Sequence, residues 1–230
     1  MTSSSLKILY AAYVRMPTEK AHGLQIASVC HALASLGHSV ELVVPERTNP
    51  IREDLFSYYS LARNFKITTV RTGFRDVSHP LHFIRGEVAF ARALARAPLA
   101  GFDICLTRSP FIVWSLGKKI HTFFEMHDFP LRFQFVWRFL LRNAKGCIST
   151  NRWKGERLRK LLHLPQDRVL VAPNGYDEKL FSSLPDKSAA RDMLKLPLDR
   201  DIILYTGNFF EWKGVSALAQ AAKLLPEPLF

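Results

Sequence analysis

Short apolar runs alternate with amphipathic helical patterns along most of this 230-residue chain. The runs are rich in Val, Ile and Leu, as are strands that are buried on both faces of a parallel sheet. The helical patterns between them supply the crossovers that parallel strands need. The expected strands lie at residues 6–12, 40–44, 66–70, 104–107, 120–126, 146–150 and 169–172. This alternation predicts an α/β fold with a doubly wound parallel sheet and right-handed crossovers.

Helices are expected between these strands. After the first strand, Ile26, Val29, Cys30 and Leu33 recur at helical spacing, and Gly37 stands where a left-handed residue would end the helix. Later helical patterns lie at residues 83–95, 110–116, 131–143 and 153–162. Ligands of such sheets bind at the carboxyl ends of the strands, so the loops there hold the first candidates for function.

The stretch 168–181, RVLVAPNGYDEKLF, marks the end of this series. Its apolar start is expected to form one more buried strand, which the Pro-Asn-Gly turn at 173–175 breaks. A linker rich in Ser, Pro and Lys, with one short helical stretch, follows at 182–197. We place the domain boundary near residue 184, which gives an N-terminal domain at 1–184.

A second apolar run at 202–206 is followed by Gly207, by Lys213 and by a helical pattern. This is the plan of a new strand-loop-helix unit. Residues 185–230 are therefore expected to hold the linker and the first strand-helix unit of a second, truncated α/β domain.

Lys and Arg number 32 against 20 Asp and Glu, which gives a formal net charge of +12. Such a bias attracts phosphates, nucleic acid or an anionic membrane surface. It is concentrated where many basic residues face only Glu156: Arg132, Arg138, Arg142, Lys145, Arg152, Lys154, Arg157, Arg159 and Lys160. Because no recognised nucleic-acid-binding module accompanies the charge, nucleic acid is not an expected partner.

Cys30, Cys105 and Cys147 are widely spaced within apolar stretches, which favours buried thiols over a zinc site or a disulfide framework. A reducing compartment fits this usage. The apolar run at 8–14 is too short to span a bilayer, and no run approaches the ~18 residues of a transmembrane helix. We expect a cytoplasmic protein without a metal site, and contact with the inner face of an anionic membrane stays open.

His127 follows the expected strand at 120–126, at its carboxyl end. A histidine there can contact a sugar hydroxyl or transfer a proton. The alternative is a histidine that forms a local hydrogen bond beside Asp128. Alternation along the strand is expected to turn Glu125 away from His127, which would give Glu125 a structural role.

Three further loop residues are candidates. Gly23 either only starts the first helix or leaves room for a ligand phosphate above the N-terminus of that helix. Arg108 ends a strand at the same edge, where it either pairs with an anion or lies on the surface. Asn174 makes a tight turn, and a ligand contact is its secondary interpretation. Arg108 and Asn174 are thus candidates for an acceptor or cleft contact.

The loop 207–214, GNFFEWKG, lies between an expected strand and an expected helix. A glycine lets backbone amides approach a phosphate, the helix N-terminus adds partial positive charge, and Lys213 supplies a full charge. The loop suits a diphosphate, although it matches neither a Walker motif nor GxGxxG. The alternative interpretation makes Lys213 a solvated loop residue.

The stretch 131–141, LRFQFVWRFLL, interleaves aromatic residues with Arg132 and Arg138. An interfacial helix would place its apolar face in a bilayer and its arginines near lipid phosphates. A crossover helix that packs on a sheet needs the same apolar stripe. We favour core packing, with the basic outer face as the part that contacts a membrane.

Five motifs together resemble glycosyltransferase family 4: AHGLQIASVCHALASLGHSVELVVP, FFEMHDFP, GCISTNRWKGERLRK, VAPNGYDEKLF and ILYTGNFFEWKG. They occur in this order across nearly the whole chain. The resemblance implies the GT-B fold of two Rossmann-like domains, in which the N-terminal domain binds the acceptor and the C-terminal domain binds a nucleotide-sugar donor. It also implies transfer with retention of configuration, with no metal and no other cofactor.

By position, the resemblance implies that Gly23 lies beside the donor phosphates, His127 faces the transferred sugar and Lys213 holds the diphosphate. Many family members have arginine directly after the glycine of the second domain, whereas this chain has Asn208, a candidate donor contact. The paired glutamates of the family's second domain have no counterpart before Phe230.

The resemblance thus implies a glycosyltransferase that moves a sugar from a UDP- or GDP-sugar to a hydroxyl of a glycan or a lipid-linked acceptor. Two alternatives stay open. One is a non-catalytic, truncated homologue that binds a membrane or a partner protein, and the other is a GT-B nucleotide-sugar epimerase.

Overall fold

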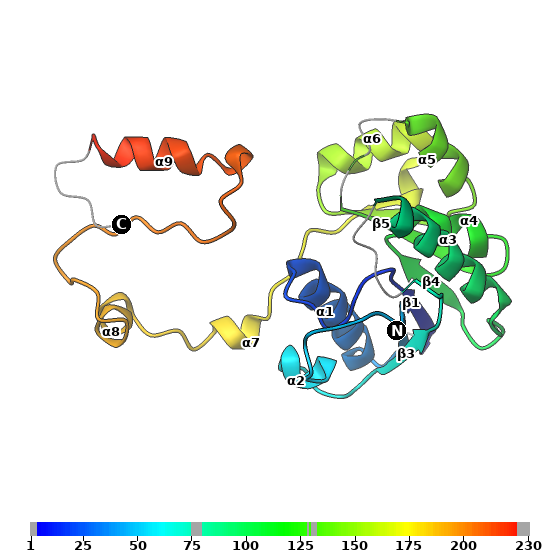
Figure 1. Ribbon diagram of the computed structural model, residues 1–230, viewed down its shortest axis with the longest axis horizontal. Coiled ribbons are helices and arrows are strands. Elements are labelled where there is room, and N and C mark those ends of the chain that lie inside the picture. Colours follow the sequence, from blue (N-terminus) through cyan, green and yellow to red (C-terminus); the bar gives the residue numbers. More distant parts are fainter. Residues whose placement is uncertain (1–3, 75–79, 128, 130–132, 225–230) are drawn as a thin grey trace. The chain divides into compact units, whose positions relative to one another are not determined.

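A computed structural model of the chain describes residues 4–74, 80–127, 129 and 133–224 (Figure 1). The chain divides into two compact units, Met1–Asn174 and Gly175–Phe230. Within the described residues, no helix is both long enough and apolar enough to cross a bilayer.

The first unit is built on a sheet of seven parallel strands in the order β3-β2-β1-β4-β5-β6-β7. From β1 the chain adds strands toward one edge as far as β3, and it then returns to add β4 to β7 toward the other edge. Ligands of doubly wound sheets bind at the carboxyl ends of the strands where this order reverses, which here is between β1 and β4. The strands are β1 Lys7–Ala11, β2 Ser39–Pro45, β3 Lys66–Val70, β4 Ile104–Thr107, β5 His121–Met126, β6 Gly146–Ser149 and β7 Val169–Val171. The predicted doubly wound parallel sheet is confirmed.

Helices cover both faces of this sheet (Figure 1). Alternate strand residues point to opposite faces, so Tyr10 packs in the same core as the buried side of α1, whereas Leu9 packs with α3 and α4. Leu141 of α5 and Leu158 of α6 join Phe124 in a core that also includes α4. The helices are α1 Ala21–Ser35, α2 Leu55–Tyr58, α3 Pro80–Arg96, α4 Pro110–Leu116, α5 Gln134–Leu141 and α6 Arg152–Leu162, and a 3-10 turn at Gln166–Arg168 precedes β7.

Short polar signals set the helix ends. Ser109 caps α4 and is followed by Pro110 at the first helical position, where the missing N–H costs nothing. Asn151 caps α6, because its Oδ1 accepts a hydrogen bond from the Lys154 N–H at 2.8 Å. Gly37 follows α1 with φ +92°, the left-handed conformation that the sequence predicts there.

The three cysteines are free and buried, as predicted. Burial raises the pKa of the Cys105 and Cys147 thiols to about 12, so these thiols stay protonated at neutral pH. They therefore act as small apolar core residues.

The prediction that the strand at 169–172 is buried is wrong. β7 pairs with β6 and is the last strand in the order of the sheet, and its Leu170 and Val171 are 61% and 41% exposed. An apolar, β-branched run does not by itself distinguish an edge strand from a central one. The predicted helix over 131–143 is described as α5 from Gln134, and its expected start at 131–132 lies outside the described residues.

The second unit contains helices and turns. It has α7 Glu178–Phe181, α8 Lys187–Met193, a 3-10 turn at Glu211–Lys213, and α9 Val215–Ala222. α8 is the short helix expected inside the linker, and α9 is the helix expected after the 207–214 loop. The predicted strand at 202–206 does not form, since Ile202 makes only an isolated bridge. A strand persists only when neighbouring strands take up its backbone hydrogen bonds, and among the described residues this segment has no such ladder.

Candidate functional site

Three neighbouring strands bring polar side chains together at the carboxyl edge of the sheet. Tyr10 lies on β1, Arg108 directly follows β4, and Glu125 lies on β5. Thr107 of β4 is paired with Phe124 of β5, so Arg108 and Glu125 occupy the next step of two adjacent strands. The parallel register therefore places an arginine beside a glutamate in a largely apolar part of the fold.

The carboxylate of Glu125 accepts hydrogen bonds from three side chains. The Tyr10 hydroxyl donates to Oε2 at 2.6 Å, Arg108 Nη2 donates to Oε1 at 3.0 Å, and His127 Nε2 lies 2.7 Å from Oε1. Arg108 Nε lies 3.3 Å from Oε2 and 3.1 Å from the Tyr10 hydroxyl. The side chains of Arg108 and Glu125 are only 16% and 12% exposed. We call Tyr10, Arg108, Glu125 and His127 the Glu125 cluster.

The contacts within the Glu125 cluster shift the pKa values of Glu125 and Tyr10. Burial alone would raise the pKa of Glu125, but the hydrogen bond from His127, the charge of Arg108 and the hydrogen bond from Tyr10 together lower this pKa to about 2. Burial raises the pKa of Tyr10 well above its ordinary value. At neutral pH, Glu125 is therefore an ionised acceptor and Tyr10 is a neutral donor.

His127 is held at two points. Its Nε2 faces Glu125, and its backbone carbonyl accepts a hydrogen bond from Nζ of Lys154 on α6. An ionised carboxylate can only accept, so the proton between the two side chains belongs to Nε2, and in the neutral ring Nδ1 is the basic nitrogen. The imidazole thus has a fixed orientation and one nitrogen that Glu125 does not engage.

The prediction that Glu125 turns away from His127 is wrong. Residues two apart on a strand share a face, so alternation places Glu125 and His127 on the same side of β5. The other predicted neighbour, Asp128, lies outside the described residues.

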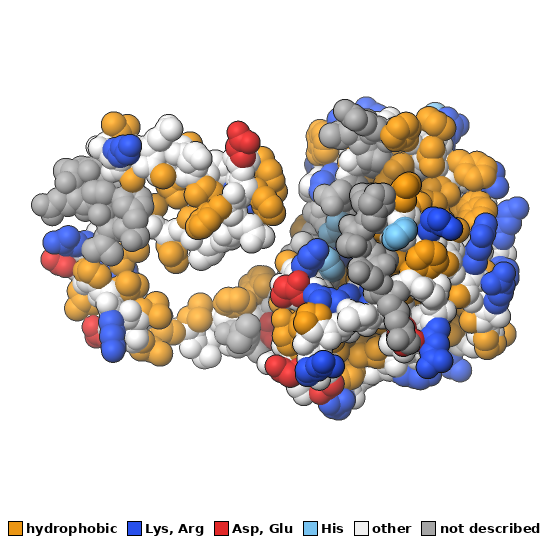
Figure 2. Space-filling view, viewed as in Figure 1, with side chains coloured by type: hydrophobic (Ala, Val, Ile, Leu, Met, Phe, Trp, Pro, Cys, Tyr) orange, Lys and Arg blue, Asp and Glu red, His pale blue; other side chains and the backbone are white. Residues whose placement is uncertain are grey.

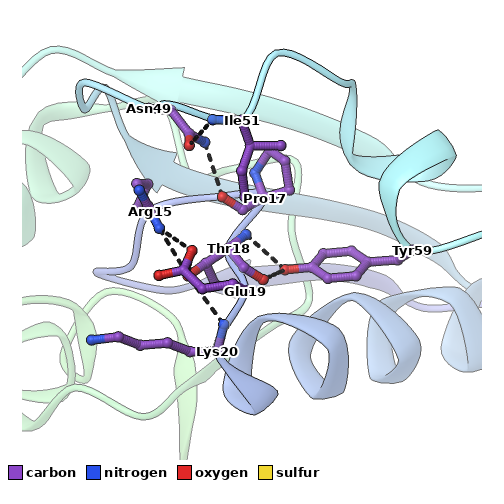
Figure 3. A network of polar contacts seen from close by, with 8 residues as sticks. All are labelled: Arg15, Pro17, Thr18, Glu19, Lys20, Asn49, Ile51 and Tyr59. Atoms are coloured by element: carbon purple, nitrogen blue, oxygen red, sulfur yellow. Dashed lines mark hydrogen bonds and ion pairs between the residues drawn. The ribbon is translucent and has the colours of Figure 1, made fainter.

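Tyr59 pins the loop between β1 and α1. Its hydroxyl accepts a hydrogen bond from the Thr18 N–H at 2.8 Å and donates one to the Thr18 carbonyl at 2.7 Å (Figure 3). Asn49 Nδ2 donates to the Pro17 carbonyl at 2.9 Å. These bonds tie the 15–20 segment to the loops after β2, so the segment has a fixed path in front of α1 (Figure 3).

Gly23 lies in the first turn of α1, next to this loop. A Cβ at this position would stand 2.3 Å from the Tyr59 hydroxyl oxygen and 2.4 Å from Cγ2 of Thr18. The missing side chain therefore allows the close approach of the loop and Tyr59 to the helix. Packing alone gives a reason for this glycine, and its role beside donor phosphates stays a prediction.

The first unit also holds the other two candidates. Arg108 belongs to the partly buried Glu125 cluster and is not a solvated surface residue. Asn174 is exposed, and its Oδ1 accepts a hydrogen bond from Nε2 of Gln25 on α1 at 2.6 Å. That bond anchors the turn after β7 to α1. The acceptor or cleft contacts of Arg108 and Asn174 stay predictions.

Lys213 and Asn208 belong to the second unit. Gly214, with φ +72°, directly precedes α9, so Lys213 stands at the N-terminal end of a helix. Lys213 Nζ lies 4.5 Å from the centroid of the Trp212 ring. The carbonyl of Asn208 accepts a hydrogen bond from the Tyr205 hydroxyl at 2.8 Å. The loop-helix half of the predicted unit is thus present, and the donor contacts of both residues stay predictions.

Sequence reasoning missed Tyr10, Lys154 and His22. Tyr10 did carry a signal, because a buried strand must pair every polar group that it contains. His22 is influenced by the charge of Arg108, a member of the Glu125 cluster. Burial is the largest cause that lowers the pKa of His22, followed by the charges of Lys20 and Arg108. Lys154 gave no signal beyond its charge.

Among the described residues, no three His, Cys, Asp or Glu side chains gather where they could hold a metal ion.

Comparison with known proteins adds a sequence match. The profile of Glycosyltransferase Family 4 matches residues 23–180. Among curated proteins, the D-inositol 3-phosphate glycosyltransferase of Xylanimonas cellulosilytica is 34% identical over 89 residues, which make up 36% of this chain and 21% of that protein. The family match includes the strands that carry Arg108, Glu125 and His127.

Solved structures share the fold. A glycosyltransferase from Rickettsia africae aligns with a TM-score of 0.63 at 16% identity, over 96% of this chain and 58% of that one. Anabaena Alr3699/HepE, solved in complex with UDP and glucose, aligns with a TM-score of 0.63 at 14% identity, over 97% of this chain and 59% of that one. The chain thus spans less than two thirds of the length of each of these three proteins.

Proposed function

This chain belongs to glycosyltransferase family 4, and from that premise we propose that it supplies the acceptor-side domain of an enzyme that uses a UDP- or GDP-sugar as donor. The proposed reaction transfers the sugar to a hydroxyl of a glycan or a lipid-linked acceptor, with retention of configuration. The observation that carries the proposal is the Glu125 cluster, which holds the imidazole of His127 at the carboxyl edge of the sheet.

In the proposed complex, His127 faces a hydroxyl of the transferred sugar. Glu125 engages Nε2, so Nδ1 is the nitrogen that accepts a hydrogen bond from that hydroxyl. Glu125 acts through His127 and is therefore a positioning residue. Arg108 balances the charge of Glu125, so the carboxylate does not repel the diphosphate of a donor.

Departure of the nucleoside diphosphate leaves negative charge on its phosphates. In the proposed reaction, Lys213 and the N-terminus of α9 stabilise this charge, and one well-placed donor of this kind lowers the barrier by about 3 kcal/mol. Asn208 would add a neutral contact where many relatives have arginine. The Anabaena structure with UDP and glucose supports a nucleotide-sugar donor for this fold.

The test uses the protein at the length found in its source cells. Labelled UDP- and GDP-sugars are incubated with this protein and with lipid or glycan extracts of the same cells, and the product is identified by its mass and by NMR of its anomeric proton. We expect label on an acceptor, with the anomeric configuration of the donor retained. A product that is only an epimer of the donor would favour a nucleotide-sugar epimerase, and absence of any donor turnover with all extracts would contradict the proposal.

A further inference from the structure

The outer side of α5 carries aromatic and cationic residues. Leu141 is buried, whereas Phe135 and Phe139 are 73% and 49% exposed. Arg138 and Arg142 are exposed too, and these four residues follow the i, i+3, i+4, i+7 spacing of one helix face. A helix that only packs on a sheet has a polar outer side. The predicted core packing therefore accounts for only one side of α5.

α6 extends this surface. Trp153 is 57% exposed, and the guanidinium of Arg157 lies 4.7 Å from the centroid of the Trp153 ring and 4.9 Å from that of Phe129. At the C-terminal end of α5, the guanidinium of Arg142 lies 4.2 Å from the centroid of the Phe139 ring. Aromatic rings and arginines are thus in direct contact on both helices. We call Phe135, Arg138 and Phe139 of α5 and Arg142 directly after it, with Trp153, Arg157 and Lys160 of α6, the aromatic-basic face.

A hollow of about 680 Å³ opens within this surface. Gln134 of α5 lines it, together with Trp153, Arg157 and Lys160 of α6. Glu156 also borders the hollow, but its carboxylate is paired with Arg159 at 3.1 Å. The hollow thus offers two cations and an aromatic wall to an anionic group.

Acidic residues are missing from this part of the chain. The sequence from 129 to 155 contains no Asp or Glu, whereas Arg138, Arg142, Lys145 and Arg152 are exposed within it. In Figure 2, hydrophobic and basic side chains intermingle over the end of the first unit where Figure 1 places α5 and α6. Positive charge and exposed aromatic rings therefore occupy the same surface.

We propose that the aromatic-basic face docks on the surface of an anionic phospholipid bilayer. The phenylalanine and tryptophan rings would enter the interfacial layer, and the long arginine and lysine side chains would reach the lipid phosphates. The hollow holds one lipid headgroup phosphate, against Arg157 and Lys160. Charge complementarity favours an anionic bilayer as the partner. The cations of the face match the negative lipid headgroups, and the exposed aromatic rings match the apolar layer beneath them.

The first turn of α6 connects this face to the candidate site. Trp153 is part of the face, and the next residue, Lys154, contacts the backbone carbonyl of His127. A docked bilayer would therefore lie beside the carboxyl edge of the sheet, where a lipid-linked acceptor can reach His127. This last step rests on the proposed function, whereas docking itself does not.

The test is flotation of the 230-residue chain with lipid vesicles in the absence of any nucleotide sugar. We expect binding to vesicles of phosphatidylcholine with about a third phosphatidylglycerol, weak binding to phosphatidylcholine alone, and loss of binding as salt rises to about 0.5 M. The double variant Phe135→Ser/Phe139→Ser should bind anionic vesicles at least about tenfold more weakly, because it loses its interfacial rings but keeps every charge.

A matched control replaces two exposed apolar residues of the second unit, Leu204→Ser/Phe209→Ser, which are 79% and 81% exposed in the parent chain. This control should bind like the parent. Arg157→Gln/Lys160→Gln should lower both the affinity and its dependence on salt. The proposal is overturned if the parent does not bind anionic vesicles at low salt, if the control loses binding as much as the α5 variant, or if the α5 variant binds like the parent. Because no donor is present, failure here leaves the proposed transferase reaction untouched.

Discussion

The Oε1 atom of Glu125 lies 2.7 Å from Nε2 of His127, and the same oxygen lies 3.0 Å from Nη2 of Arg108. One carboxylate thus neutralises a shielded arginine and orients the histidine. Glu125→Gln keeps the shape of this side chain but leaves Arg108 without its counter-charge. We expect the free energy of unfolding at neutral pH to fall by about 3 kcal/mol, measured by urea denaturation. Glu156→Gln breaks a more exposed ion pair and should cost at most about 0.5 kcal/mol.

The loss of unfolding free energy caused by Glu125→Gln should depend on pH. The folded pKa of Glu125 is about 2, whereas a glutamate in an unfolded chain has a pKa of about 4.3. A lowered folded pKa means that the ionised form stabilises the fold fully above the unfolded pKa, and that this contribution is lost as pH falls through the folded pKa. The stability difference between parent and variant should therefore shrink between pH ~5 and pH ~2. If the difference in unfolding free energy between parent and variant stayed constant over that range, Glu125 would not be ionised in the folded protein at neutral pH.

Two tyrosines near the end of β1 should differ in how loss of the hydroxyl changes the stability of the fold. The Tyr10 hydroxyl donates to Glu125 at 2.6 Å, so Tyr10→Phe should cost about 1 to 2 kcal/mol. The Tyr13 hydroxyl is buried, and within the described parts of the chain it makes no hydrogen bond of good geometry, although the charge of Arg47 acts on it. Tyr13→Phe keeps the ring under the Arg47 guanidinium and should leave stability equal or raise it by up to about 1 kcal/mol. Thermal unfolding of both variants is the measurement, and a larger loss for Tyr13→Phe would contradict the packing described here.

Gly23→Ala tests why this position is a glycine. The added methyl would overlap the Tyr59 hydroxyl and Thr18, so we expect a loss of about 1 to 3 kcal/mol in unfolding free energy. Gly101→Ala is the matched control, since no heavy atom of the described residues, apart from Gly101 itself and its chain neighbours, lies within 4 Å of the added Cβ. If Gly23→Ala were as stable as the control and bound donor more weakly, the glycine would serve the ligand and not the packing.

Lys213→Ala tests the proposed phosphate contact in the protein of native length. Loss of one charge that stabilises the leaving diphosphate should slow donor turnover roughly a hundredfold. Lys223→Ala, just after α9, removes an equal charge and should change turnover less than twofold, roughly the scale of a remote surface charge. Release of nucleoside diphosphate from the donor is the readout. Equal kinetics in both variants would remove Lys213 from the site.

Strong periodicity made most of the fold predictable. Local pattern and turn chemistry predict the central strands and the helix that has Ile26 and Cys30 on its buried side. They also predict the end of that helix at Gly37. The exposure of β7 and the missing strand at 202–206 could not be predicted in the same way. Both depend on which neighbours a segment finds, and an apolar run does not encode its neighbours.

The candidate site was only partly predictable. His127 and Arg108 stand directly after apolar runs, so their places at the sheet edge follow from strand ends. Alternation along β5 alone places Glu125 beside His127. The contact of Glu125 with Arg108 required the register between β4 and β5, which links residues far apart in the chain. The contact from Lys154 depends on how α6 packs, and no local pattern of the sequence contains that information.

The most direct test of the account is donor turnover by the protein of native length with His127→Ala, compared with His121→Ala. His121 begins β5 at its amino end and is exposed, so the two variants change one imidazole at opposite ends of the same strand. Release of nucleoside diphosphate from the preferred UDP- or GDP-sugar is measured for both. We expect turnover to fall about a hundredfold or more for His127→Ala and to stay at the parent level for His121→Ala. Parent-like turnover of His127→Ala would contradict the central claim that the Glu125 cluster holds His127 against the transferred sugar.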